Sequence, residues 1–361
     1  MDSPQHESLN RQFLAKMLRC VMPSVSVLMP IKGDCPYLPF AIQSVRAQSF
    51  VDWELVICKD LIDDTSSRYL ADLVEMDSRI KIIDTVGLAL PSALNKGLEE
   101  CNGEFIARFD ADDIMLPGRL HSQVLFLQEN PEYVVCGGQI VIIDENQKLA
   151  VASPYYNLND LALKRKISYK CPFPHPASTI RTQTLRDALG YSAQYKFAED
   201  YELWLRLSSL GKFANLKKPV LAYRTYASQT SARFRAETRL FMANALVENL
   251  RSEKKLINLV RMPVTTDLFQ EQYLLLDEPE KAIVDKYYRH DSFLADLLRK
   301  SPSIRSEKSR LNGFFDLFSS SPRRLEHMML RLLVSLYSFI TIRPVWKRYI
   351  SRLSSESAPS K

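Results

Sequence analysis

The sequence lacks the patterns that would indicate a zinc-stapled, disulfide-rich or secreted protein. Its six cysteines are scattered, with no C-x-x-C pair and no histidine at zinc-ligand spacing. We therefore interpret them as free thiols in a reducing compartment. The N-terminal segment, residues 1–23, carries charges throughout and has no sustained apolar stretch, unlike a secretory signal. These absences predict a cytoplasmic protein.

A basic surface spread over the whole chain is also lacking. The 361 residues have a formal net charge of +6. Up to Ser231 there are 25 Lys and Arg residues against 27 Asp and Glu residues, whereas the remainder has 23 against 15. Because the surplus belongs to the C-terminal part alone, we do not expect a nucleic acid partner.

The first two thirds of the chain alternate strand-like and helix-like segments. Helical periodicity is found at 38–48 and 89–100. Such alternation predicts an α/β fold with a mostly parallel sheet. The strand-like segments are runs rich in β-branched and aromatic residues at 25–29, 53–58, 80–84, 105–109 and 134–139.

Beyond residue 231 the alternation gives way to helix-like stretches. We therefore divide the chain into an N-terminal extension (1–23), an α/β domain (24–231) and a mainly helical C-terminal region (232–361). The segment 323–352 is apolar, aromatic and basic, but it has only 11 uncharged residues between Arg331 and Arg343. A membrane-spanning helix needs about 20.

This basic hydrophobic segment (323–352) has the composition of a segment that lies on an anionic membrane surface. The alternative is that it packs against the α/β domain or in a dimer interface. The first interpretation predicts a peripheral protein on the cytoplasmic face of the membrane.

Carboxylates follow two of the predicted strands. Asp60 comes after the second strand, and Asp110, Asp112 and Asp113 come directly after the fourth. Ligands bind beyond the C-terminal ends of parallel strands, and carboxylate oxygens suit Mn²⁺ or Mg²⁺. A bare D-x-D is nevertheless more often a solvated acidic loop.

Other polar residues have ordinary structural interpretations when taken alone. Glu199 and Asp200 open a predicted helix and complement its dipole. His175, set between prolines, is a structural loop histidine in this interpretation. Arg206 and Arg224 are surface or ion-pair arginines by default.

Four segments in order resemble the GT-A glycosyltransferases of the family 2 type. They are 25–60, 103–132, HPASTIR at 175–181 and AEDYELWLRL at 198–207. The resemblance implies the GT-A nucleotide-diphospho-sugar transferase fold, which is Rossmann-like, followed by a helical extension. It also implies an inverting, metal-dependent, hexosyltransferase-like enzyme of cell-surface polysaccharide synthesis. Its donor is a nucleotide sugar, with UDP-sugar favoured, and its acceptor is a glycan or glycolipid hydroxyl.

The resemblance assigns roles to the acids. Pro30 and Asp60 flank the donor nucleobase, and Asp110 faces the ribose. Asp112 holds the metal ion, with Asp110 and Asp113 as further ligands. In this chain Lys59 precedes Asp60 where many relatives have a second acid, which leaves the identity of the base open.

The resemblance also assigns the acceptor side. Asp200, in a Glu-Asp pair with Glu199, is the base that deprotonates the acceptor hydroxyl. Lys96 is the candidate replacement for a phosphate or base contact, because the usual Arg-Asn pair is Leu-Asn here. His175 and Arg206 are candidate acceptor or phosphate contacts.

Three alternatives remain beside this interpretation. Phosphatases with an aspartate nucleophile place a similar acidic pair after the first strand, whereas here it follows the fourth. Nucleotidyltransferases have a glycine-rich turn after the first strand, whereas residues 30–34 read PIKGD. A non-catalytic interaction protein on this fold would be expected to lack Asp110, Asp112 or Asp200, and all three are present.

Overall fold

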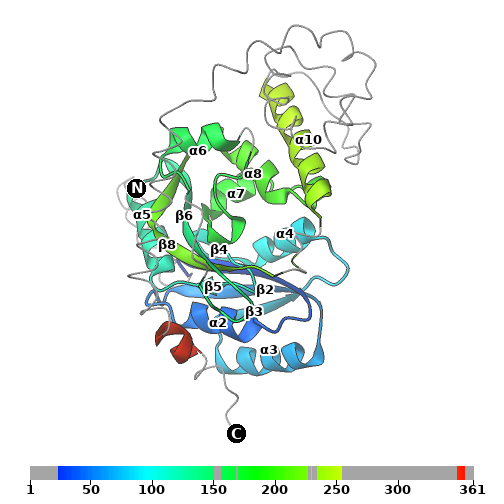
Figure 1. The fold of residues 1–361 in the computed structure, drawn as a ribbon, viewed down its shortest axis with the longest axis vertical. Coiled ribbons are helices and arrows are strands. Elements are labelled where there is room, and N and C mark those ends of the chain that lie inside the picture. The colour runs from blue at the N-terminus through cyan, green and yellow to red at the C-terminus, as the bar shows by residue number, and fades with distance from the viewer. Residues whose placement is uncertain are drawn as a thin grey trace, which may run out of the picture.

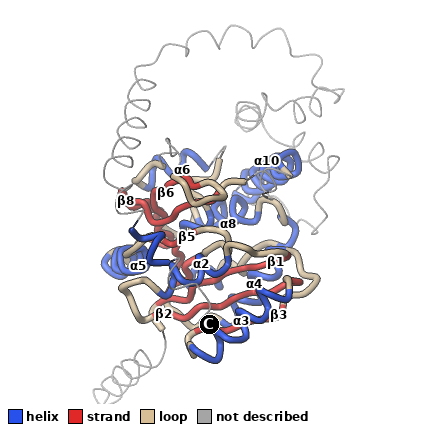
Figure 2. Tube along the Cα trace, turned by 60° about the horizontal axis from the view of Figure 1, so that its bottom comes forward, coloured by secondary structure: helices blue, strands red, loops and turns tan. Residues whose placement is uncertain are grey.

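The computed structural model describes residues 23–149, 156–167, 170–226, 229, 234–253 and 348–353. In this part of the chain a central sheet runs through the molecule, with helices on both of its faces (Figures 1 and 2). The strands are β1 (Val25–Gly33), β2 (Trp53–Ile62), β3 (Ile80–Asp84), β4 (Phe105–Arg108), β5 (Ile114–Met115), β6 (Tyr133–Ile143), β7 (Thr179–Arg181) and β8 (Lys212–Arg224). Their order in the sheet is β3-β2-β1-β4-β7-β6-β8-β5.

The helices lie between the strands along the chain. Two of them, α2 and α4, carry a proline in the first turn, where its missing N–H costs no hydrogen bond. The helices are α2 (Leu38–Arg46), α3 (Asp64–Met76), α4 (Leu90–Glu100), α5 (Arg119–Glu129), α6 (Asp160–Ile167), α7 (Thr182–Asp187), α8 (Glu199–Leu207) and α10 (Arg235–Glu253).

One half of the sheet is parallel. β1 pairs with β2 and with β4, and β2 pairs with β3, all in parallel. These four strands were predicted from their runs of β-branched and aromatic residues, and the structure confirms them. Their C-terminal ends meet at one edge, so the residues that follow β1, β2 and β4 are brought together.

The other half of the sheet is mixed, but four of the seven pairings between the described strands are parallel, so the expectation of a mostly parallel sheet is confirmed. β7 is antiparallel to β4 and to β6, and β5 is antiparallel to β8, while β6 and β8 run parallel. The strands β5, β7 and β8 were not predicted. β5 and β7 are too short to show an alternation, and Lys217, Lys218 and Pro219 interrupt the apolar pattern of β8.

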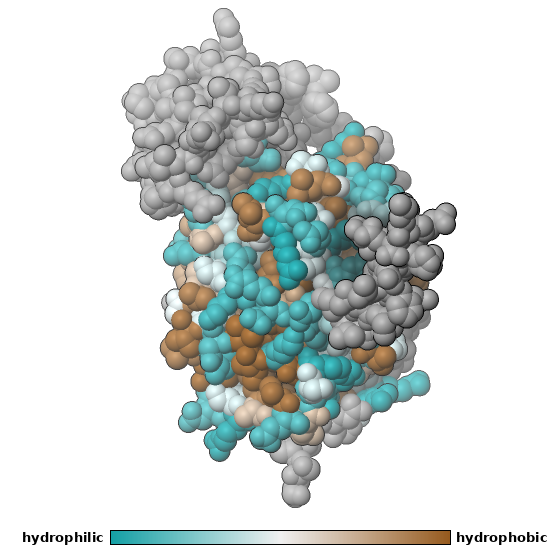
Figure 3. Space-filling model, turned by 180° about the vertical axis from the view of Figure 1, so that it is seen from behind, coloured by the Kyte–Doolittle hydropathy of each residue, from teal (hydrophilic) through white to brown (hydrophobic). Residues whose placement is uncertain are grey.

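Each face of the sheet carries its own hydrophobic core. Apolar residues of α2, α3 and α5 pack on one face, and those of α4, α8 and α10 pack on the other. Figure 1 shows α2 and α3 on one side of the strands and α4 and α8 on the opposite side. Because α10 packs on α8, the core extends past the boundary that we placed at residue 231. Seen from behind, the described surface has small apolar groups between polar side chains (Figure 3).

The end of the basic hydrophobic segment contacts the α/β domain. Leu353 is fully buried in a cluster with Ile114 and Ala222, and Tyr349 packs against the same cluster. The Tyr349 hydroxyl donates a hydrogen bond to the carbonyl oxygen of Met115 at 2.9 Å. Residues 348–353 therefore follow the packing alternative, not the membrane-surface one. The rest of the segment, 323–347, and almost all of the N-terminal extension lie outside the described residues.

Two further expectations concern the described residues alone. No helix among them is both long enough and apolar enough to cross a membrane. The five cysteines in the described ranges are free, as predicted, although only three of them are buried: Cys58, Cys101 and Cys136.

Candidate active site

Two adjoining cavities form a cleft beyond the C-terminal ends of β1, β2 and β4. The larger lobe has a volume of about 920 Å³ and is lined in part by Pro30 and Asp60. The smaller lobe has a volume of about 520 Å³ and is lined in part by His175, Glu199 and Asp200. The two lobes are continuous, since both are lined by Leu90, Arg108, Asp110, Asp112, Lys196, Phe197 and Tyr226.

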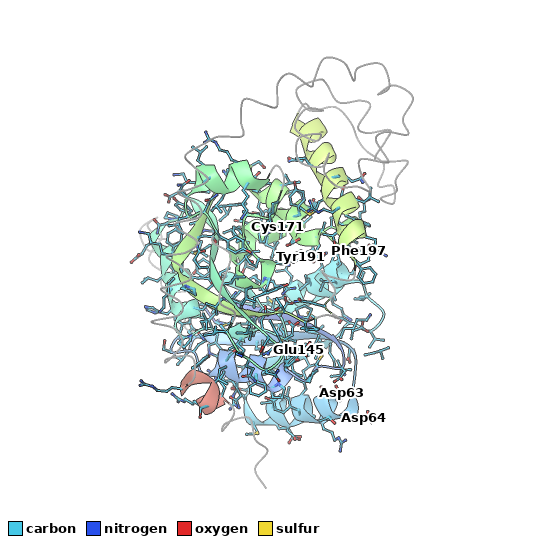
Figure 4. All side chains as sticks on the ribbon, in the orientation of Figure 1. Asp63, Asp64, Glu145, Cys171, Tyr191 and Phe197 are labelled. Carbon is cyan, nitrogen blue, oxygen red and sulfur yellow. The ribbon has the colours of Figure 1, made fainter. Side chains whose placement is uncertain are left out.

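The cleft draws its walls from both sides of the sheet. Cys171 and Phe197 lie on the side of α8 and α10, and Glu145 lies on the opposite side (Figure 4). Asp63 and Asp64, the acids that follow Asp60 most closely, lie at the start of α3 and are not among the residues that line either lobe (Figure 4). Proximity in sequence therefore did not bring every acid of this segment into the site.

Three carboxylates gather in the loop between β4 and β5. Asp110, Asp112 and Asp113 each offer an oxygen atom, and these oxygens lie within 4.8 Å of one another. Burial and the charge of Asp110 raise the pKa of Asp112 to about 6. Burial, followed by the charges of its two neighbours, raises the pKa of Asp113 well above its ordinary value. The cluster is therefore short of positive charge.

The donor set of this cluster fits a divalent cation. Asp113 Oδ1 accepts the backbone N–H of Arg224 at 2.8 Å, but its Oδ2 is buried without a hydrogen-bond partner among the described residues. Asp112 Oδ2 accepts a hydrogen bond from the Tyr226 hydroxyl at 2.9 Å. Hard oxygen ligands of this kind are preferred by Mg²⁺ and Mn²⁺, whose charge would relieve the repulsion.

Two buried arginines hold the loop through its backbone. Arg119 donates to the carbonyl oxygens of Arg108, Pro176 and Ser178. Arg224 Nε donates to the Asp112 carbonyl oxygen at 2.7 Å. The default interpretation of Arg224 as a surface or ion-pair arginine was wrong, because its side chain is fully buried and bonds backbone carbonyls.

The acid pair lies in the smaller lobe at the start of α8. Asp200 Oδ1 accepts the N–H of Tyr201 at 2.7 Å, and the Cys171 thiol donates to Oδ2 at 3.4 Å. Burial, helped by the charge of Asp200, raises the pKa of Glu199 to about 8. Burial also raises the pKa of Asp200. A carboxylate with a raised pKa is a stronger base than an exposed one.

Asp60 lies in the larger lobe with Pro30, as predicted for two residues that act together. Asp60 Oδ1 accepts the backbone N–H groups of Leu61 and Gly87 at 2.8 and 3.1 Å. Lys32 makes an ion pair with its Oδ2 at 2.6 Å. These hydrogen bonds to Lys32 and the backbone lower the pKa of Asp60, so it is ionised at neutral pH.

Two predicted contacts lie outside the lining of both lobes as described. Lys96 is about two turns into α4, and its ammonium donates to the Asp84 carbonyl oxygen at 2.7 Å. Arg206 makes an ion pair with Glu202 one turn earlier in α8 and donates to the Gly190 carbonyl oxygen. The structure thus agrees with the ion-pair interpretation of Arg206.

His175 does line the smaller lobe. Its Nε2 shares a hydrogen bond of 2.9 Å with the Tyr191 hydroxyl, and its ring packs edge-on against Trp204. Burial lowers its pKa well below the ordinary value, so the ring is neutral. It can therefore offer a neutral hydrogen-bonding group to a ligand, but not a cation.

Sequence reasoning passed over Arg108, Lys196 and Cys171 as lining residues. Arg108 lies two residues before Asp110, but no sequence pattern distinguishes a buried arginine from an exposed one. Lys196 precedes the Glu-Asp pair by three residues, a spacing that could have drawn attention to it.

The sequence of this chain is similar to those of known glycosyltransferases. The family model described as Glycosyl transferase family 2 matches residues 26–189. EpsE of Bacillus subtilis (strain 168), named as a glycosyltransferase, is 30% identical over 197 residues, covering 52% of this chain and 68% of EpsE. The chain belongs to glycosyl transferase family 2. The predicted resemblance is confirmed, and the protein is a glycosyltransferase.

Two further family comparisons agree. WbnJ of Escherichia coli, an O-antigen biosynthesis glycosyltransferase, is 29% identical over 214 residues, covering 58% of this chain and 83% of WbnJ. The crystal structure of S. aureus TarS 1-349 in complex with UDP-GlcNAc matches with a TM-score of 0.53 at 16% identity. That match covers 76% of this chain and 81% of the TarS chain. The fold is therefore the GT-A fold of family 2 glycosyltransferases.

Proposed function

We propose that this family 2 glycosyltransferase moves a sugar from a nucleotide-diphosphate donor to a hydroxyl of a glycan or lipid-linked acceptor, with inversion at the anomeric carbon. One observation carries the proposal. Asp110 and Asp112 of the carboxylate cluster line the junction of the lobes, and the Glu199–Asp200 pair lines the smaller lobe of the same cleft. This arrangement suits a donor diphosphate at the junction and an acceptor hydroxyl beside the base.

The larger lobe is the proposed donor site. Its volume of about 920 Å³ and its lining by Pro30 and Asp60 support binding of a nucleoside. The TarS structure, which is a complex with UDP-GlcNAc, supports a UDP-sugar as the donor. The name of WbnJ supports a role in the synthesis of a cell-surface polysaccharide.

Asp200 is the proposed base. The acceptor oxygen forms a bond to the anomeric carbon while its proton passes to the Asp200 carboxylate. The bond between that carbon and the diphosphate oxygen breaks, and the electron pair leaves with the nucleoside diphosphate. Attack from the side opposite the leaving group inverts the anomeric configuration.

Asp110, Asp112 and Asp113 are the proposed ligands of Mn²⁺ or Mg²⁺. The bound ion supplies charge stabilisation for the departing diphosphate. The three carboxylates are already positioned for the ion by the fold. Their oxygens lie within 4.8 Å of one another, and the paired strands β4 and β5 hold the loop on either side.

The proposal includes a place of action. We infer that the chain works in the cytoplasm and meets a lipid-linked acceptor at the cytoplasmic face of the membrane. The basic and aromatic composition of 323–347 supports this. The full chain should sediment with vesicles that contain anionic lipid at low salt, and failure to do so would contradict the membrane part alone.

A donor panel tests the main proposal. The full chain is incubated with Mn²⁺ and UDP-, GDP-, dTDP-, CDP- and ADP-sugars, and release of the nucleotide is measured. EDTA should abolish release, and added Mn²⁺ or Mg²⁺ should restore it. Full turnover in chelator would contradict metal dependence, and NMR of a product with the donor's own anomeric configuration would contradict inversion.

A further inference from the structure

Arg108, the last residue of β4, is one of two buried arginines near the carboxylate cluster that keep a buried nitrogen without a hydrogen-bond partner among the described residues; the other is Arg224, through Nη2, and of the two only Arg108 lines the cleft. Its side chain is only 5% exposed, and its Nη1 makes an ion pair with Asp110 Oδ1. Its Nε is buried and has no hydrogen-bond partner among the described residues. Arg119, by contrast, donates from Nε, Nη1 and Nη2 to neighbouring protein oxygens.

A buried donor without a partner costs free energy unless something binds it. Arg108 lines both lobes, so a ligand that spans the junction can reach it. The guanidinium of Arg108 lies between the carboxylate cluster and the Glu199–Asp200 pair. Its positive charge lowers the pKa values of Asp112, Glu199 and Asp200, against the effect of burial.

We propose that Arg108 binds the β-phosphate of the sugar-nucleotide donor and stabilises the negative charge that this phosphate gains as it leaves. The inference rests on the proposed function and adds a protein cation to it. In the transfer step the new bond joins the acceptor oxygen to the anomeric carbon, and Asp200 takes the proton. The bond from that carbon to the β-phosphate oxygen breaks, and its electron pair stays on this oxygen.

The chemistry of the guanidinium suits this position. Its planar fork presents parallel N–H groups that match two oxygens of a phosphate, while an ammonium group offers only a point charge. The ion pair with Asp110 uses Nη1 and leaves Nε without a hydrogen-bond partner among the described residues. Because the charge on the β-phosphate grows during bond cleavage, the contact strengthens in the transition state.

A nucleotide series tests the inference on the full chain. Binding of UDP, GDP, dTDP, CDP and ADP to the wild type in Mn²⁺ is measured by calorimetry, and the tightest diphosphate is then compared with its own monophosphate. The variants are Arg108→Lys, which keeps a charge beside Asp110, and Arg108→Gln, which removes it. Arg186→Gln is the matched control, since Arg186 donates to the carbonyl oxygens of Leu98 and Cys101 away from the cleft.

The expected result is selective. In Arg108→Lys the diphosphate should bind roughly tenfold more weakly, and in Arg108→Gln roughly 10- to 100-fold more weakly, while the monophosphate binds as in the wild type. With the donor identified by the panel, kcat should fall by a larger factor than KM rises. The control should bind both nucleotides normally, and thermal melting confirms that each variant is folded.

Three results would overturn the inference. Equal weakening of monophosphate and diphosphate binding would mean that Arg108 acts only through Asp110 and the rest of the site. A loss confined to the intact sugar nucleotide would place the contact on the sugar. If Arg108→Gln fails to fold and Arg108→Lys binds the diphosphate normally, the side chain is structural. A wild type that binds no diphosphate and releases no nucleotide would instead refute the proposed function.

Discussion

The hydroxyl of Tyr226 donates a hydrogen bond to Oδ2 of Asp112 at 2.9 Å, and so joins the residue just beyond β8 to the acidic loop that follows β4. The two residues are 114 positions apart in the chain. The phenol holds one carboxylate oxygen in place, which leaves the other for a metal ion.

Removal of that hydroxyl should weaken metal binding. Partners that orient a ligand typically contribute about 10- to 100-fold to metal affinity, so Tyr226→Phe should bind Mn²⁺ at least about tenfold more weakly. Calorimetry with Mn²⁺ alone measures this without reference to activity. Tyr69→Phe is the control, because the Tyr69 hydroxyl is buried without a hydrogen-bond partner among the described residues. Unchanged Mn²⁺ affinity in Tyr226→Phe would contradict the prediction.

Asp200→Asn should reduce turnover without loss of donor binding. A positioned base typically contributes about 10² to 10⁴ in rate, and the amide cannot accept the proton. The measurement is kcat for nucleotide release, together with donor affinity by calorimetry. Glu199→Gln is the matched comparison, because the pKa of Glu199, raised to about 8, leaves it mostly protonated at pH 7. A larger loss in Glu199→Gln would assign the base to Glu199 instead.

Glu199→Gln should also change how stability depends on pH. Burial raises the pKa of Glu199 from 4.5 to about 8, so between these values the folded state holds a proton that the unfolded chain releases. The wild type therefore loses stability as the pH rises through this window, and the glutamine variant does not. The variant should melt at least about 2 °C above the wild type at pH 8, with a smaller difference at pH 5. A difference independent of pH would contradict this account.

Leu353→Ala should destabilise the α/β domain from its distant C-terminal end. Leu353 is fully buried against residues of β5, β6 and β8, and loss of a buried leucine side chain costs about 2 to 5 kcal/mol. Urea unfolding of the full chain measures the change. Ser351→Ala, at an exposed position of the same segment, is the control and should change little. Equal stability of both variants would mean that the segment does not pack on the domain in solution.

In the parallel half, β1, β2 and β4 could be predicted because most of their residues are apolar and most are buried, and β3 because three of its five residues are isoleucine. In the other half β6 was predicted as well, but β5, β7 and β8 were not. In β8 the two lysines and Pro219 interrupt the apolar pattern. The pairing with β6 accommodates them through register shifts next to Gly138 and Gln139. Such a segment becomes a strand because it pairs with a neighbouring strand, and a single sequence does not show which strand that is.

The candidate site divides along similar lines. The acids Asp60, Asp110, Asp112 and Asp200 could be found because each follows a strand or opens a helix in a motif of fixed spacing. Lys96 could not be placed, because its helix is directed at the cleft only through its first turn. Arg108 shows the reverse case, since burial and the absence of a partner at Nε are properties of the folded chain alone.

The hydrogen bonds of Arg119 affect how the sequences of such enzymes can diverge. Its guanidinium joins the strand that leads to the acidic loop with the turn at 175–178, and every bond that crosses between them ends on a main-chain carbonyl oxygen. A carbonyl oxygen is present whatever the side chain, so most substitutions in this turn leave the brace intact. Substitutions in the turn at 175–178 can therefore change the smaller lobe, the proposed acceptor side, while the acidic loop on the proposed donor side keeps its position.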